Sequence, residues 1–199
     1  MRARKLDAEF FDRPPTEVAG DLVGRTLVRK HYGSRIAGVI TETGAYGGHE
    51  GKVTDNRRGL YYPAGHVYVQ SFRGQNFLNI STSQKDGPSV VCIRKVFPTE
   101  RIISMAENRG KRLDTDVQFS DLLGLENHTT IPQNEVRKLE SLTNGPGRVA
   151  EAFGIDKKFD RTSLGKKIWI EGERARYVTE INPTDASDNC LGYYSTVFL

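Results

Sequence analysis

The sequence predicts a single α+β domain in which helices surround a curved, mostly antiparallel β-sheet. Its 199 residues fit one domain, and a chain of this length can bury roughly 70% of its unfolded surface in one core. Short β-branched and apolar runs separated by turn residues recur through the first half of the chain, which is typical of strands joined as hairpins. No internal repeat or linker divides the sequence, so we expect one domain over residues 1–199.

The first elements that the sequence predicts are a short helix and a hairpin. Residues 16–23 place apolar side chains at helical spacing behind Thr16, which we expect to cap the helix. Residues 25–29 and 35–43 flank a turn at 31–34, and this pattern predicts an antiparallel pair of strands. Further strands are expected at residues 66–70, 75–80, 89–95, 168–170 and 175–181.

The second half of the chain is less regular. A helix is expected at residues 99–108, where apolar side chains form one stripe, and a glycine-rich loop at 145–148 should lead into another helix. Residues 110–142 are polar and contain Pro132. We therefore expect an irregular insertion with short helices over that range.

The composition of the chain excludes several classes of protein. No apolar run approaches the ~20 residues that a membrane span requires, and the basic start is not followed by the apolar core of a signal peptide. We expect an intracellular, cytoplasmic protein, associated with the nucleoid if its source is bacterial. The four histidines and two cysteines lack metal-ligand spacing, so we expect neither a metal nor another cofactor.

The positive charge of the chain is concentrated in places that suit a phosphate backbone. The formal net charge of +4 fits an anionic partner without identifying one. Residues 94–112 hold several lysines and arginines, and Arg57 and Arg58 form another basic turn. Each cluster is equally compatible with a solvated surface. The aromatic side chains and basic face would also suit single-stranded RNA.

Residues 39–46 are the strongest candidate for a functional site. Glu42, Gly44 and Tyr46 occupy alternate positions of an apolar and β-branched run, so on a strand they would face the same side. The irregular, glycine-rich residues 47–51 follow directly. This pattern indicates a pocket wall that opens into a loop, although a half-buried strand ending in a glycine turn would have the same pattern.

Short motifs in collinear order make the chain resemble the alkyladenine (3-methyladenine) DNA glycosylase family. They cover about four-fifths of the chain, and the match fades beyond Glu180. The resemblance implies a monomeric enzyme with that family's fold, which rotates an alkylated or deaminated purine out of double-stranded DNA and hydrolyses its N-glycosidic bond without a metal. The motifs are Phe10-Phe11, Glu42 to Tyr46, Pro63 to Val69, Leu78 to Ile80, Cys92 to Arg94, Thr143 to Gly147 and Phe159 to Arg161.

The resemblance also implies roles for individual residues. Tyr46 would stack on the extruded base, Asn79 would exclude normal guanine, and Arg94 would help to hold the attacking water and a nearby phosphate. Each residue also has a structural interpretation: sheet packing for Tyr46, a strand-end hydrogen bond for Asn79 and a surface charge for Arg94. Asp55 falls near a histidine of the family's base pocket, and Gln70 falls where the family has a second pocket tyrosine.

Two further regions are expected to touch the DNA outside the base pocket. Phe72 or Arg73 is the candidate for the side chain that wedges into the gap left by the base. Gly147 and Arg148, at a predicted helix start, would present backbone N–H groups and charge to a phosphate. A plain capping turn would explain the same glycines.

The chain departs from the family at its catalytic position. The family's general base is a glutamate two residues before the stacking tyrosine, and that position here is Gly44. Glu42 would have to act from about 6 to 7 Å away along the strand, with Asp55 opposite the sugar. The alternatives are a slow glycosylase with weakened catalysis, a catalytically inactive protein that binds damaged DNA, and an introduced substitution at a natural glutamate.

Overall fold

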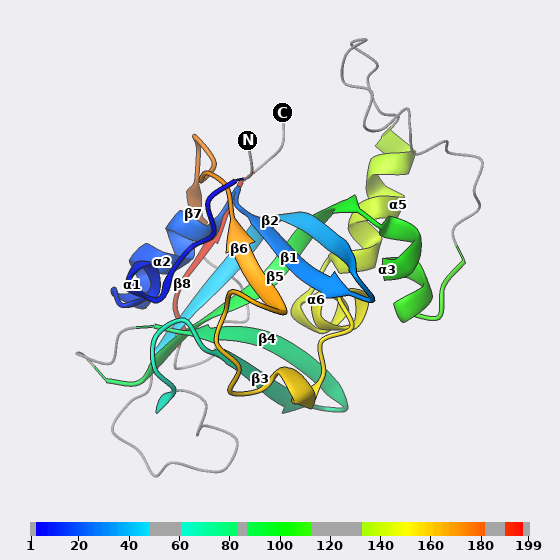
Figure 1. Cartoon of the computed structure of the whole chain (residues 1–199). Helices are drawn as coiled ribbons and strands as arrows, with labels where there is room; N and C mark the ends of the chain where they lie inside the picture. Colours follow the sequence, from blue (N-terminus) through cyan, green and yellow to red (C-terminus); the bar gives the residue numbers. More distant parts are fainter. Residues whose placement is uncertain (1–2, 48–60, 83–86, 113–132, 182–189, 197–199) are drawn as a thin grey trace.

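A curled antiparallel sheet lies at the centre of the structure, with α1 and α2 at the left of the view in Figure 1 and α3, α5 and α6 at the right. The structure is a computed structural model that describes residues 3–47, 61–82, 87–112, 133–181 and 190–196. The strands follow the order β3-β4-β5-β2-β1-β6, and β8 pairs with both β2 and β7. The α+β class expected from the sequence is confirmed.

The first hairpin joins β1 (Thr26–His31) to β2 (Ser34–Gly47). Tyr32 and Gly33 form its two-residue turn with φ of 45° and 81°, the left-handed geometry that matches the twist of a hairpin. The predicted pair is confirmed, but β2 continues to Gly47. Its first half pairs with β1 and its second half with β8, while β5 follows it along the other edge.

The remaining strands complete the sheet around β2. A second hairpin has the same kind of turn, with φ of 48° at Arg73 and 78° at Gly74. The bounds of the strands are β3 Val67–Phe72, β4 Gln75–Ser81, β5 Ser89–Glu100, β6 Ile168–Glu171, β7 Thr179–Ile181 and β8 Cys190–Ser195. The sequence did not predict β8, and of the strand predicted at 175–181 only β7 forms.

Two of the predicted helix starts were wrong. Pro15 occupies the first turn of α2 (Pro15–Leu22), so Thr16 lies inside the helix and does not cap it. No side chain caps the start of this helix. A proline at the first turn already has helical φ, and its missing N–H is not needed there. The helix predicted from residue 99 begins only at Ile102, because β5 stays paired with β2 as far as Glu100. Arg101, with φ of 58°, makes the change of direction between them.

The other helices are short and lie mostly against the sheet. One of them, α5, falls partly within the insertion predicted at 110–142, where short helices were expected, and residues 113–132 lie outside the described part of the chain. The bounds of the helices are α1 Ala8–Phe11, α3 Ile102–Asn108, α5 Gln133–Thr143, α6 Pro146–Ala152 and the 3₁₀ turn η3 Lys157–Phe159. Within the described ranges, none of these helices has the length and apolarity needed to cross a membrane.

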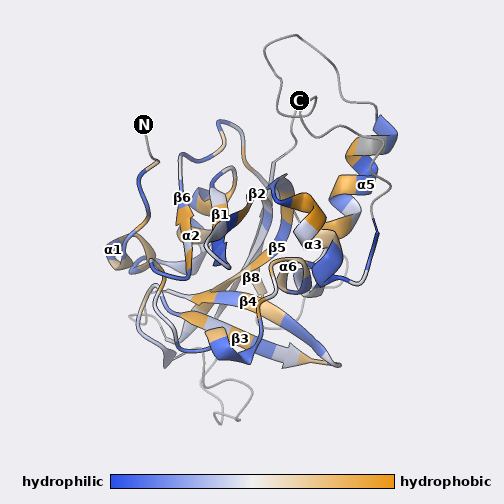
Figure 2. Ribbon diagram, turned by 45° about the vertical axis from the view of Figure 1, so that its right-hand side comes forward, coloured by the Kyte–Doolittle hydropathy of each residue, from blue (hydrophilic) through white to orange (hydrophobic). Residues whose placement is uncertain are grey.

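The core lies on one face of the sheet, where α2 and α6 cover it. Hydrophobic positions on the strands, including β4 and β6, are visible in Figure 2. Core side chains alternate along β3, β4, the second half of β2 and the first half of β5, and they are Ala45, Val67, Val69, Leu78, Ile80, Val91 and Ile93. Because side chains on a strand alternate between faces, the residues between them lie on the opposite face, which we call the polar face. Ile36, Ile40 and Val96 also belong to the core, beyond the register shifts between β2 and β5.

Candidate active site

A row of paired residues crosses the polar face of the sheet. Asn79 on β4 pairs with Cys92 on β5, Cys92 pairs with Gly44 on β2, and Gly44 pairs with Tyr193 on β8. Cross-strand partners in antiparallel strands share one face. Asn79, Cys92, Gly44 and Tyr193 therefore lie on one surface of the sheet.

A β-bulge on β5 gives the polar face its charges. Thr43 pairs with Ile93 and Glu42 with Lys95, so Arg94 is the extra residue between them. A bulge of this kind re-aims the side chains on either side of it. Arg94 Nε lies 2.8 Å from Glu42 Oε1 and Lys95 Nζ lies 2.5 Å from Glu42 Oε2.

Glu42 is thus held between two cations and is only 5% exposed. Each carboxylate oxygen has a cationic partner. Burial is the largest single influence on Arg94 and lowers the pKa of its guanidinium. The hydrogen bond to Glu42, together with electrostatic interactions with Tyr46, Tyr193 and Cys92, outweighs burial, so the pKa is raised above its usual value. The structure therefore brings together Glu42 and Arg94, the two residues predicted to carry the chemistry. It also gives Glu42 a structural role, because its carboxylate pairs with two cations of β5.

Tyr46 lies two residues further along β2 and is half-buried. Its hydroxyl donates to the Tyr193 hydroxyl at 2.7 Å and accepts from Arg94 Nη1 at 3.2 Å. Burial is the main reason that the pKa of the Tyr46 phenol is raised well above its ordinary value. The ring therefore stays neutral, with its hydroxyl fixed from two sides.

Tyr193 fills the space beside Gly44. A Cβ atom placed on Gly44 would lie 2.6 and 2.7 Å from two ring atoms of Tyr193 and 2.9 Å from the Tyr46 ring. Distances this short are strongly repulsive. Gly44 is therefore required by the close approach of β8, and no side chain fits at this position while Tyr193 keeps its place.

Asn79 has a well-defined structural role. It is 2% exposed, and its Nδ2 donates to the main-chain oxygens of Tyr68 and Phe77, each at 3.3 Å. These bonds fit the interpretation of Asn79 as a hydrogen-bonding residue within the strands. Its place in the row across Gly44 keeps it within the candidate site.

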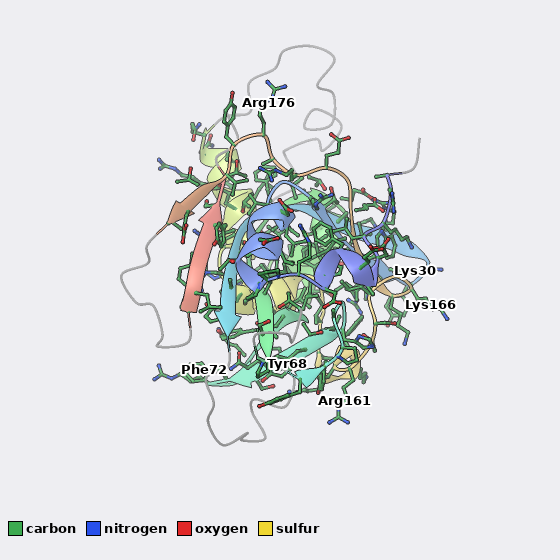
Figure 3. All side chains as sticks on the ribbon, turned by 90° about the vertical axis from the view of Figure 1, so that its left-hand side faces the viewer. Lys30, Tyr68, Phe72, Arg161, Lys166 and Arg176 are labelled. Carbon is green, nitrogen blue, oxygen red and sulfur yellow. The ribbon has the colours of Figure 1, made fainter. Side chains whose placement is uncertain are left out.

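The β3–β4 hairpin extends the polar face to an exposed tip. Gln70 and Phe72 lie on the same side of β3, and Gln70 is half-buried. Phe72 is 51% exposed at the edge of the molecule (Figure 3), and the Arg73 guanidinium carbon lies 5.2 Å from its ring centre. The tip has the exposed aromatic ring and adjacent cation expected of a side chain that enters DNA, and the wedge stays a prediction.

Gly147 and Arg148, the two described residues predicted to contact the DNA backbone, have different surroundings. A Cβ atom on Gly147 would lie 2.5 Å from Gln75 Oε1, so the glycine lets α6 approach β4. Arg148 is exposed. Asp55, Arg57 and Arg58 lie outside the described residues.

Tyr193 is the residue of this site that sequence reasoning missed. The only local signal was the β-forming run Tyr193-Tyr194 near the end of the chain. Nothing in that run indicates a partner almost 150 residues earlier in the sequence. Among the described residues, no group of three histidine, cysteine or acidic side chains is placed to bind a metal.

Comparison with known proteins shows the family of the chain. The family model for methylpurine-DNA glycosylase (MPG) matches residues 9–185. A Clostridium novyi protein named "Putative 3-methyladenine DNA glycosylase" is 34% identical over 185 residues, which cover 87% of this chain and 83% of that protein. Human "DNA-3-methyladenine glycosylase" is 30% identical over 178 residues, which cover 84% of this chain and 54% of the human protein. The match spans β2, β4 and β5, which carry most of the polar face, and the chain belongs to the methylpurine-DNA glycosylase family.

Proposed function

We propose that this chain binds duplex DNA containing an alkylated purine, rotates the base against Tyr46 and hydrolyses its N-glycosidic bond slowly. The observation that carries the proposal is the position of Arg94, which hydrogen-bonds to both Glu42 and Tyr46. A stacking ring and a fixed positive charge are thereby held together on one face. The names of the relatives support an alkylated purine as the substrate.

Rotating a base out of the duplex costs a few kcal/mol. Stacking on an aromatic ring returns roughly 1–3 kcal/mol per base, and Tyr46 is the half-buried ring next to the row, two residues beyond Gly44 on β2. Phe72 or Arg73 fills the gap in the duplex, and Arg94 attracts a backbone phosphate. Lesions that pair poorly are the cheapest to extrude, which gives the site a first level of selection.

The lesion determines how much catalytic help the reaction needs. A purine alkylated at a ring nitrogen carries a positive charge and leaves the sugar as a neutral base, so its glycosidic bond is already weak. A deaminated or ethenoadenine base is neutral and is a poorer leaving group. Without a proton acceptor at Gly44 the site loses an effect worth about 10²–10⁴-fold, and we therefore restrict the proposal to positively charged, alkylated purines.

A second candidate function is binding of damaged DNA without excision. It is favoured by the packing of Tyr193 against Gly44 and by the two cations on Glu42. Because of these contacts, neither position 42 nor position 44 offers an unengaged proton acceptor. Such a protein would mark or shield the lesion for another enzyme.

The test is single-turnover release of bases from a methylated duplex, compared with duplexes containing hypoxanthine or ethenoadenine. Wild type should release methylated bases faster than the spontaneous rate and leave the neutral lesions in place. Tyr46→Ala should slow release by roughly 10-fold or more through loss of stacking. Tyr32→Ala is the matched control, because Tyr32 is an aromatic residue that is 95% exposed at the other hairpin tip. Tight binding of the methylated duplex with release at only the spontaneous rate would establish the second candidate.

A further inference from the structure

Tyr193 comes from a part of the chain that lies outside the family match. The family model ends at residue 185, whereas β8 begins at Cys190 and pairs with the second half of β2. The pairing sets Tyr193 directly opposite Gly44. A strand beyond the matched region therefore supplies a side chain to the centre of the candidate site.

Three contacts hold the Tyr193 ring in place. Its hydroxyl accepts the hydrogen bond from Tyr46 at 2.7 Å, and the two rings meet edge to face with centres 5.9 Å apart. The Arg94 guanidinium carbon lies 4.1 Å from the centre of the Tyr193 ring, which is a cation–π distance. Tyr193 is 4% exposed. Moving the ring would break its contacts with both functional residues.

The same ring excludes any side chain from position 44. The nearest ring atoms lie 2.6 Å from where a Cβ atom would be, and an aromatic ring cannot bend away as a flexible chain can. A carboxylate at this position would project from the strand beside Tyr46, next to the extruded nucleotide. The Tyr193 ring already occupies the space that this carboxylate would need.

We propose that Tyr193 is the specificity-determining residue of this site. Its ring occupies the space of a carboxylate at position 44, so the site excises only lesions whose glycosidic bond is already weak, and it binds neutral lesions without excising them. This inference rests on the proposed function for its substrate class. In structural terms, position 44 has no proton acceptor for two reasons: glycine has no side chain, and β8 places the Tyr193 ring where a side chain would lie.

The test compares wild type, Gly44→Glu, Tyr193→Ala and the double variant Gly44→Glu/Tyr193→Ala on a duplex containing ethenoadenine. The folding of each variant is checked by thermal melting. In the double variant the introduced carboxylate takes a proton from water as the water oxygen bonds to sugar C1′. The bond from C1′ to the base breaks, and the base leaves with the electron pair and takes a proton from solvent.

The double variant should release ethenoadenine on the order of 10²-fold faster than wild type, the size of a general-base effect. Gly44→Glu alone should show no gain, because the Tyr193 ring leaves no room for the carboxylate. An equal gain in Gly44→Glu alone, or a folded double variant without a gain, overturns the proposal.

If the double variant does not fold, chemical rescue decides the question. Tyr193→Ala opens a cavity beside Gly44, and added formate should raise ethenoadenine release with a saturating concentration dependence. Tyr193→Phe keeps the ring and is the matched control, which should not respond to formate. The same response in both variants, or none in folded Tyr193→Ala, overturns the proposal.

These outcomes separate the inference from the proposed function. If wild type releases no methylated base but the double variant releases ethenoadenine, the proposed function fails and the role of Tyr193 stands. If wild type releases methylated bases and the double variant gains nothing, the proposed function stands and the role of Tyr193 fails.

Discussion

The polar face of β2 has two ends with different chemistry, although they are only a few residues apart. At one end Glu42 is enclosed by Arg94 and Lys95. At the other end Gly44 and Tyr46 pack against the ring of Tyr193. The first end holds two cations paired with one carboxylate, whereas the second offers neutral aromatic surface. Arg94 belongs to both, because it bonds to Glu42 and to Tyr46.

In the function proposed above, this difference would let the site keep its stacking surface while base-assisted hydrolysis is weakened. Stacking needs a flat ring on a rigid strand, which the aromatic end provides. Base-assisted hydrolysis needs an unengaged proton acceptor next to the sugar. At the charged end both oxygens of the carboxylate are engaged by cations. At the aromatic end the ring of Tyr193 fills the space that a carboxylate at position 44 would need.

The largest effect on stability is expected at the charged end. Glu42→Gln removes the anion that Arg94 and Lys95 share. The Glu42 side chain is 7% exposed and those of its partners are 22% and 42% exposed, so the loss in the free energy of unfolding should lie at the lower end for a buried ion pair, about 3 kcal/mol. Denaturant unfolding measures this loss.

The matched control for that experiment is Glu100→Gln. Glu100 pairs with Arg35, and their side chains are 41% and 42% exposed. An exposed pair contributes at most about 1 kcal/mol. Equal losses in the two variants would show that the Glu42 cluster is not a buried charge centre.

The next effect is expected at the aromatic end. Gly44→Ala forces a methyl group against the rings of Tyr193 and Tyr46, and overpacking of this kind costs about 2 kcal/mol. Gly20→Ala is the control, because the nearest atom of Tyr194 would lie 3.6 Å from the new Cβ, an ordinary contact. Thermal melting should show a lower Tm for Gly44→Ala and no decrease for Gly20→Ala. If Gly44→Ala melted like wild type, the close packing of β8 would be refuted.

A smaller effect is expected where the polar face reaches the tip of the β3–β4 hairpin. Phe72→Ala should weaken binding of a lesion-containing duplex by roughly 5-fold, the lower end of the range for one stacked ring. Tyr32→Ala should leave this affinity unchanged. Tyr32 is two residues from Lys30, and Lys30 lies on the opposite side of the molecule from Phe72 (Figure 3). Competition binding measures both. A larger loss in Tyr32→Ala would move the DNA-binding surface to the other hairpin.

Near neutral pH no effect of Tyr68 ionisation is expected, because the effect appears only in alkaline solution. Burial raises the pKa of Tyr68, on the same face, to about 12, above the usual value near 10. Below pH 10 folded and unfolded chains both keep this proton, so stability does not change. As pH rises toward 12 the unfolded chain loses the proton first and stability falls. Absorbance titration should show delayed ionisation in the folded chain, and ionisation of every tyrosine near pH 10 would contradict it.

Local sequence patterns predicted much of the fold. The first hairpin and the strands at 66–70 and 75–80 were predicted because turn residues and β-branched runs lie next to each other, and the pairing of those two strands was not. Alternation along residues 39–46 correctly placed Glu42, Gly44 and Tyr46 on a strand. The Thr16 cap was wrong because proline already begins α2, and the helix start at 99 was wrong because pairing with β2 outweighed helical spacing.

The parts of the site that could not be predicted depend on contacts between distant segments. The bulge at Arg94 follows from the register between β2 and β5. The place of Tyr193 follows from pairing across most of the chain. Neither leaves a periodic signal in the sequence. The engagement of Glu42 by two cations is likewise a consequence of register.

The central claim is that the extruded base stacks on Tyr46, and a lesion-preference measurement tests it most directly. Affinities are compared for duplexes identical except for ethenoadenine in place of adenine, with wild type, Tyr46→Ala and Tyr32→Ala. Wild type and Tyr32→Ala should prefer the lesion by roughly 10-fold or more, and Tyr46→Ala should bind both duplexes equally. A preference that survives in Tyr46→Ala would contradict the account.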